Sequence, residues 1–146
     1  MLIFMDIAFD DPTLAVFLEN RILAQRLFVV GDPKPVGYSH FDIAGGCAYI
    51  EEIYVDPDHA GQRLSALLID SIAALALSRS LEALLLSTFK DLPWKAPYYR
   101  KLGFAKIPDA ILRPALLAIR KEHVERGLDE TKRIFMRRAL PQNPDV

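Results

Sequence analysis

Residues 47–86 read CAYIEEIYVDPDHAGQRLSALLIDSIAALALSRSLEALLL, and this stretch decides the fold. The first nine residues are rich in β-branched and aromatic side chains and stop at Asp56-Pro57, where proline removes a ladder donor, so they predict a strand over 47–55. From about Gly61 to Arg79 apolar residues recur at i, i+3 and i+4, which predicts a long amphipathic helix. The apolar run 83–86 predicts a strand covered on both faces. A strand, a helix and a strand in this order form a parallel pair with a right-handed crossover.

The flanking segments complete a mixed sheet with helices on both faces. Turn residues and helix caps divide them into elements of ordinary length. We expect strands at 2–8, 27–30, 36–41 and 133–140, and helices at 12–25, 94–102 and 114–127. The sequence therefore predicts an α/β (α+β) fold with one central, mostly antiparallel sheet.

Length and composition argue against several classes of partner and location. The chain has 146 residues and a formal net charge of -1, so we expect a single domain over residues 1–146 and no electrostatic attraction to nucleic acid or to an anionic membrane. No stretch approaches the roughly 18–20 apolar residues of a membrane span. Cys47 is the single cysteine, which excludes an intrachain disulfide and favours a reducing, cytoplasmic location. The scattered histidines lack metal-ligand spacing, and we expect no metal.

The turn before the long helix offers a seat for a phosphate group. A helix that begins here leaves about four backbone N–H groups unpaired, with the positive end of the helix dipole behind them. Such a terminus binds a pyrophosphate with little help from side chains. Taken alone, the turn also fits an ordinary helix start, because only Gly61 offers close backbone approach.

Two motifs identify the chain as similar to the GNAT superfamily of N-acetyltransferases. Residues 49–57 resemble the family's strand ending in Val-x-Pro, which leads into the loop (Arg/Gln)-x-x-Gly-x-(Gly/Ala). Residues 97–104, Pro-Tyr-Tyr-Arg-Lys-Leu-Gly-Phe, resemble the motif Phe-Tyr-x-x-Leu-Gly-Phe. Residues 88–97 and 112–138 resemble a bacterial subgroup in which Pro-Trp-Asn-Ala-Pro precedes the tyrosine pair. The resemblance covers roughly residues 27–140 and implies a GNAT fold, with the parallel strand pair splayed around acetyl-CoA.

The resemblance also implies roles for individual residues. Tyr99 takes the place of the tyrosine that protonates the departing CoA thiolate, and Tyr98 is a packing residue. Backbone N–H groups of the strand end would hold the pantetheine arm and polarise the acetyl carbonyl, and the loop would hold the pyrophosphate. The expected cofactor-binding residues are Ile53, Tyr54, Val55, Ala60, Gly61, Gln62, Arg63, Leu64, Ser65 and Lys95.

The adjacent carboxylates Glu51 and Glu52 are the candidate bases. A primary amine has a pKa near that of lysine, about 10, and only its neutral form attacks a thioester, so a carboxylate must remove a proton directly or through water. Neighbouring strand residues point to opposite faces, so at most one faces the acetyl group unless a bulge intervenes. Glu51 matches the base position of polyamine-type GNAT enzymes, and Glu52 would then bind the acceptor or form an ion pair. Two surface glutamates on a strand edge are the simpler alternative.

Departures from the family pattern keep other functions open. In the loop, Ala60 stands where the family has Arg or Gln, Arg63 where it has Gly, and Ser65 where it has Gly or Ala. Lys95 replaces the Asn of the bacterial subgroup. We expect Arg63 to take helical dihedrals, so that the backbone seat survives. The leading hypothesis is acetylation of a small-molecule amine. A CoA-binding module without catalysis, an acetyltransferase for protein lysines or N-termini, and an interaction domain without cofactor are the alternatives.

Two further expectations concern the C-terminal part of the chain. The apolar end strand around Phe135 would permit a homodimer. His123, with Glu122 and Glu125 beside it, is interpreted as a surface residue of the last helix.

Overall fold

Strand β3 (Cys47–Val55) has the bounds that the sequence predicts. The computed structural model describes residues 25–31, 34–61 and 63–141. The predicted strand at 2–8, the helix at 12–25 apart from its last residue, and Gln62 lie outside the described residues.

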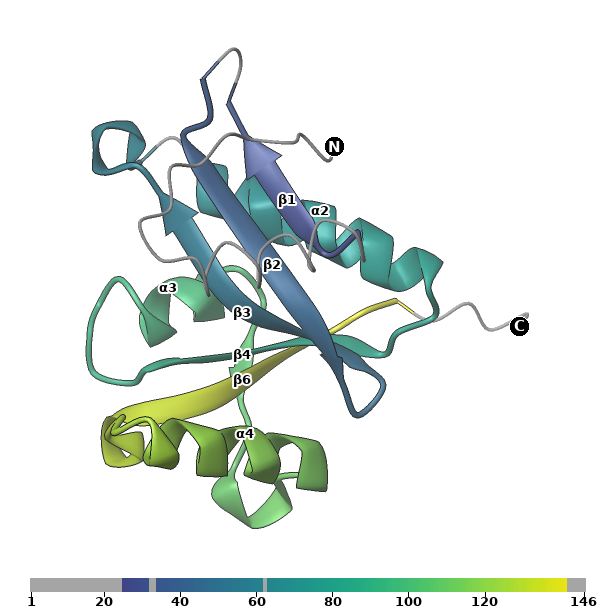
Figure 1. Ribbon diagram of the computed structural model, residues 1–146, viewed down its shortest axis with the longest axis vertical. Coiled ribbons are helices and arrows are strands. Elements are labelled where there is room, and N and C mark those ends of the chain that lie inside the picture. The colour runs from purple at the N-terminus through teal and green to yellow at the C-terminus, as the bar shows by residue number, and fades with distance from the viewer. Residues whose placement is uncertain (1–24, 32–33, 62, 142–146) are drawn as a thin grey trace. The chain divides into compact units, whose positions relative to one another are not determined.

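Among the described residues, six strands form one mixed sheet in the order β1-β2-β3-β4-β6-β5 (Figure 1). Strands β3 and β4 are parallel, whereas the pairs β1–β2, β4–β6 and β5–β6 are antiparallel. The remaining strands are β1 (Leu27–Val30), β2 (Gly37–Ala44), β4 (Ala83–Phe89), β5 (Ala105–Lys106) and β6 (Arg133–Ala139). The helices that flank the sheet are α2 (Leu64–Ser78), α3 (Ala96–Lys101) and α4 (Pro114–Glu125), with 3₁₀ turns η1 (Pro57–His59), η2 (Asp109–Ile111) and η3 (Glu130–Lys132). The predicted mixed, mostly antiparallel sheet with its parallel pair is confirmed.

The chain divides into two compact units. Of the described residues, the first unit contains those up to Asp42 together with those of Ile50–Leu75, and the second contains Ile43–Tyr49 and those from Ala76 onward. Strand β3 and helix α2 each contribute residues to both units.

In the first unit, β1 and β2 form a hairpin in which Leu27 lies opposite His40 and Val30 opposite Gly37. Helix α2 buries one side through Leu68, Ile69 and Ile72, which are fully buried, while Leu67 is exposed. This one-sided burial makes α2 amphipathic, as expected, although the spacing of apolar residues placed Leu67 on the buried side.

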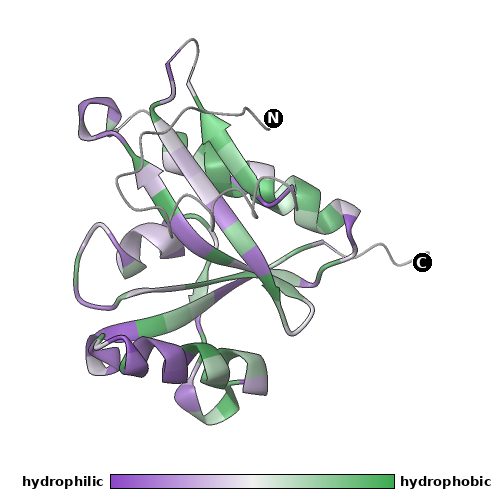
Figure 2. Ribbon diagram, in the orientation of Figure 1, coloured by the Kyte–Doolittle hydropathy of each residue, from purple (hydrophilic) through white to green (hydrophobic). Residues whose placement is uncertain are grey.

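In the second unit, β4 pairs with β6 along its whole length, from Ala83 opposite Ala139 to Phe89 opposite Arg133. The core packs on this pair and consists of apolar side chains from the sheet and from the segment around α4. Its buried members are Cys47, Tyr49, Ala83, Leu85, Leu112, Leu116 and Phe135. In Figure 2 the first turns of α4 are hydrophobic and its last turns hydrophilic, and the buried residues of this helix are Leu116 and His123.

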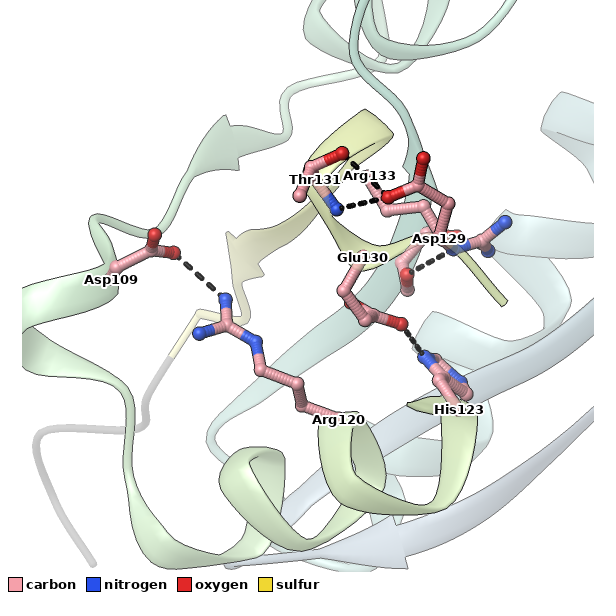
Figure 3. Close-up of polar contacts among 8 residues, drawn as sticks. Asp109, Arg120, His123, Asp129, Glu130, Thr131 and Arg133 are labelled. Carbon is pink, nitrogen blue, oxygen red and sulfur yellow. Dashed lines mark hydrogen bonds and ion pairs between the residues drawn. The ribbon is translucent and has the colours of Figure 1, made fainter. Parts of the chain in front are cut away.

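The interpretation of His123 as a surface residue is wrong. Its side chain is only 11% exposed, and Nδ1 lies 2.5 Å from Oε1 of Glu130, whose side chain is 12% exposed (Figure 3). The imidazole also stacks on the ring of Phe135, with 6.4 Å between centroids. Because Glu130 comes from η3, after the helix has ended, the acidic neighbours on the helix gave no indication of this buried pair.

The strand around Phe135, which we expected to permit a homodimer, has buried apolar side chains in the described part of the chain. Phe135 is only 2% exposed, and β6 is hydrogen-bonded to β4 on one side and to β5 on the other. The carbonyl of Phe135 accepts a bond from the N–H of Ile107 at 2.9 Å. A homodimer stays a prediction.

Candidate active site

The two candidate bases lie near the end of β3, in the first unit, and each contacts a ring from β2. Nδ1 of His40 lies 3.3 Å from Oε1 of Glu51. The hydroxyl of Tyr38 donates a hydrogen bond to Oε1 of Glu52. The rings of Tyr38 and His40 are themselves stacked, 6.2 Å apart and nearly parallel. Adjacent carboxylates thus reach two rings that pack against each other, although regular alternation would separate the carboxylates by the thickness of the strand.

Glu52 belongs to an exposed cluster of polar and aromatic groups. Besides the Tyr38 contact, its carbonyl accepts a bond from the Ser39 hydroxyl at 2.7 Å. The rings of Tyr38 and Tyr54 lie 5.6 Å apart. Burial and the hydrogen bond to Glu52 raise the pKa of Tyr38 well above its ordinary value, so this tyrosine keeps its proton and Glu52 keeps a donor. The Tyr38–Glu52–Tyr54 cluster therefore offers a negative charge beside two aromatic rings, a combination that suits an organic cation.

Glu51 is in a drier environment than Glu52. Its side chain is 21% exposed, and that of His40 is only 5% exposed. With a proton on Nδ1, His40 donates to the Glu51 carboxylate and fixes its orientation. Strand pairing brings this histidine to the glutamate; the sequence showed only a histidine in a hairpin strand.

The predicted phosphate loop begins with a capped 3₁₀ turn and ends in two left-handed residues. The Asp56 carboxylate accepts from the N–H of Asp58 at 3.0 Å and caps η1. Gly61 and Arg63 follow with φ of +85° and +59°. The expectation that Arg63 takes right-handed helical dihedrals is therefore wrong, and α2 begins one residue later, at Leu64. A Cβ built on Gly61 would meet no described atom within 4 Å, so the backbone there is open to a ligand.

Tyr99 lies on α3 in the second unit, held by aromatic neighbours. Its ring meets those of Tyr98 and Phe104 edge to face, at centroid distances of 5.4 and 5.9 Å. Its carbonyl accepts from the N–H of Phe104 at 3.0 Å, and Gly103 takes φ +95° where the helix ends, as the motif predicts. Burial, with a smaller contribution from Tyr98, raises the pKa of Tyr99 to about 12. The phenol is therefore protonated throughout the neutral range and acts as a donor.

Lys95 occupies the N-cap position of α3 and makes no side-chain cap. An ammonium has no acceptor for the free N–H groups of the first turn, whereas the Asn of the resembling subgroup is a favoured cap. The replacement at this position thus changes the helix start as well as the charge.

The predicted site residues fall in both units. The first unit holds Glu51–Val55 and the described part of the loop up to Ser65, and the second holds Lys95 and Tyr99. Within the described residues no group of three or more His, Cys, Asp or Glu side chains could hold a metal ion. No helix in the described part of the chain has the length and apolarity required to cross a membrane.

The sequence profile of the Acetyltransferase (GNAT) family matches residues 4–104. That is 101 of the 146 residues, and it includes both glutamates and the tyrosine motif. The chain belongs to the GNAT acetyltransferase family. It is accordingly an acyltransferase.

Solved structures of acetyltransferases share the fold of this GNAT protein. One is the N-acetylglutamate synthase of Neisseria gonorrhoeae, complexed with coenzyme A and N-acetyl-glutamate. It has a TM-score of 0.69 and 17% identity, and the match covers 87% of this chain and 28% of the synthase chain. A putative streptothricin acetyltransferase of Bacillus anthracis, in complex with acetyl coenzyme A, has a TM-score of 0.60 and 16% identity over 79% of this chain and 62% of its own. The ribosomal-protein-S18-alanine N-acetyltransferase of Escherichia coli has a TM-score of 0.58 and 16% identity, and the match covers 90% of this chain and 80% of the E. coli chain. At these identities the likeness establishes the fold.

Proposed function

We propose that this GNAT protein transfers the acetyl group of acetyl-CoA to the primary amine of a small molecule, by direct transfer in a ternary complex, and that residues 1–146 act as one domain. The family match carries the proposal, because it includes both the Glu51–Glu52 strand and the Tyr99 motif. Two of the structural neighbours were solved with coenzyme A or acetyl coenzyme A, which supports the same donor here.

The donor would be held largely by backbone groups. The N–H groups of Ile53, Tyr54 and Val55 would bind the pantetheine arm, and those of the loop from Ala60 to Ser65 would bind the pyrophosphate at the start of α2. The open backbone at Gly61 and the absence of an acidic residue in the first turn of α2 fit an anion. The Arg63 and Lys95 side chains would add positive charge.

The chemistry divides between a base and an acid. The Glu51 carboxylate, oriented by His40, would take the proton from the ammonium, directly or through water. The neutral nitrogen then attacks the acetyl carbonyl carbon, the C–N bond forms, and the C–S bond breaks. Tyr99 would donate its phenolic proton to the leaving sulfur, and the phenolate would recover a proton, directly or through water, from the nitrogen as the amide forms. The raised pKa of Tyr99 ensures that the phenolic proton is present. No residue of the protein needs to carry the acetyl group.

The Tyr38–Glu52–Tyr54 cluster supports a small cationic acceptor. An exposed carboxylate beside a pair of aromatic rings can hold an ammonium group by charge and by cation–π contact. The E. coli neighbour acetylates an alanine of a ribosomal protein, by its name, so a protein N-terminus is the second candidate acceptor.

Release of CoA thiol from acetyl-CoA tests the proposal, across a panel of small amines and of peptides with free N-termini or lysines. We expect turnover with at least one small amine. Tyr99→Phe should lower kcat by about a hundredfold, the lower end of the range for a lost general acid, whereas the adjacent Tyr98→Phe should change it little. Glu51→Gln should reduce kcat, and Glu52→Gln should mainly raise KM for the amine. Turnover with peptides alone would favour the second acceptor, and equal effects of the two tyrosine variants would contradict the assigned acid.

A further inference from the structure

The second unit contains a cavity of about 370 Å³ that the proposed acetyl transfer does not use. It lies between the sheet and the segment that leads into α4, with walls from the Ala44–Gly45 turn, β4, β6 and the first turn of α4. No residue of the Tyr98–Phe104 motif lines it. Its size falls in the range of about 300–1,000 Å³ that is typical of small-molecule sites.

The walls of this cavity are mostly apolar. Leu85 and Leu116 are buried members of the core, and Ile107 packs against that core. Ile111 also lines the cavity, yet it is 65% exposed. An apolar ligand body in the cavity would cover Ile111 and would contact the leucines without displacing any hydrogen bond.

Two guanidinium groups give the cavity its charge. Arg113 and Arg137 are the only charged residues that line it among the residues the structure describes. Arg113 is 63% exposed and lies 3.4 Å from Glu82, an exposed pair that contributes little. The half-buried Arg137 forms no ion pair with any residue in the described part of the chain. A cationic group in an apolar cavity without an acidic lining residue would be stabilised by a bound anion.

We propose that this cavity binds a monocarboxylate with an apolar body. The carboxylate pairs with the fork of Arg137, which matches carboxylate geometry in a bidentate way, and Arg113 adds a second cation. The apolar body fills the space against Leu85, Ile107 and Leu116. The start of α4, which has no acidic residue in its first turn, places its positive dipole end at the same wall. This ligand is chemically distinct from both acetyl-CoA and an amine, so the inference stands independently of the acceptor.

Titration of the full chain with octanoate tests the proposal, with octan-1-ol as the probe that has the same chain and no charge. Isothermal calorimetry measures both affinities. We expect octanoate to bind at one site per chain and more tightly than octan-1-ol. Arg137→Gln should weaken octanoate binding about tenfold, equivalent to about 1.4 kcal/mol. Arg138→Gln is the matched control, because it removes the same charge from the next residue of β6, which lies beside Gly103 and does not line the cavity.

A second variant keeps the test decisive if Arg137→Gln folds poorly. Ala115→Phe adds a ring at the cavity wall and should abolish octanoate binding while the melting temperature without ligand stays close to that of the parent chain. The proposal is overturned if octan-1-ol binds as tightly as octanoate. It is equally overturned if octanoate binds the Ala115→Phe protein with unchanged affinity.

Discussion

Arg63 holds the backbone of the predicted phosphate loop in a conformation that its own side chain disfavours. Its φ is +59°, in the left-handed region, and α2 begins at the next residue. The Arg63 carbonyl accepts from the N–H of Leu67 at 3.1 Å, so the strained residue is tied to the first turn of the helix. Glycine, which the family pattern has here, would adopt this φ without a steric penalty. Two variants, Arg63→Gly and Arg63→Ala, therefore separate the strain from the side chain.

The expected magnitudes follow from the backbone. A left-handed conformation costs a residue with a Cβ about 1–2 kcal/mol, and glycine loses about 0.5–1 kcal/mol more than alanine in backbone entropy. Arg63→Gly should therefore be about 0.5–1 kcal/mol more stable than Arg63→Ala, or roughly 1–4 °C in Tm for a chain of this size. Both variants lose the guanidinium, so both should bind CoA about tenfold more weakly, equivalent to about 1.4 kcal/mol.

Thermal unfolding without ligand and calorimetric titration with CoA measure the two effects separately. The Tm difference between the glycine and alanine variants reports the strain, and the shared loss of affinity reports the guanidinium. Equal Tm values for the two variants would refute the left-handed strain. Affinities equal to that of the parent protein would refute a phosphate contact by Arg63, and the backbone N–H groups would then be sufficient.

Two further predictions concern stability. Glu130→Gln should lower the free energy of unfolding by about 1–3 kcal/mol, because it weakens a buried hydrogen bond to His123. Lys132→Gln, which removes one partner of an exposed ion pair, should change it by less than about 0.5 kcal/mol. Equal urea midpoints for the two variants would contradict this prediction. Since the pKa of Tyr99 is raised from 10 to about 12, the folded state holds the proton more tightly than the unfolded state. Its contribution to stability is complete below pH 10 and is lost as the pH rises from about 10 to 12. Urea midpoints of the parent and the Tyr99→Phe protein over this range measure the loss, and identical pH profiles would show that Tyr99 titrates normally.

Elements were predicted best where two local signals agree. Strand β3 has glycines before it and Asp56-Pro57 after it, and its predicted bounds are confirmed. The glycines at 45 and 46 both have positive φ and form the two-residue turn between β2 and β3. By contrast, α2 begins three residues later than Gly61, because Arg63 interrupts the right-handed conformation. Nothing in the residue type arginine indicates a positive φ, so this boundary could not be predicted locally.

Sequence motifs identified the residues of the candidate site but not the contacts that they make with other strands. Glu51, Glu52 and Tyr99 were identified from motifs, each within one element. Their neighbours Tyr38 and His40 come from β2, and their contacts depend on strand pairing. The register of a β2–β3 hairpin closed by two glycines puts His40 opposite Glu51 and could have indicated that contact. The same register puts Ser39 opposite Glu52, so the contact between Tyr38 and Glu52 could not have been predicted from it.

The contacts of the two glutamates support different roles for them. Tyr38 donates a hydrogen bond to the Glu52 carboxylate, which is the more exposed of the two. The raised pKa of Tyr38 means that the phenol keeps this proton, so the bond persists across the neutral range. Glu51 instead lies beside the His40 imidazole, and its side chain is only 21% exposed. In the proposed mechanism the less exposed Glu51 therefore suits removal of the proton from the amine, whereas the exposed Glu52, with Tyr38 and Tyr54 beside it, suits binding of the cationic amine.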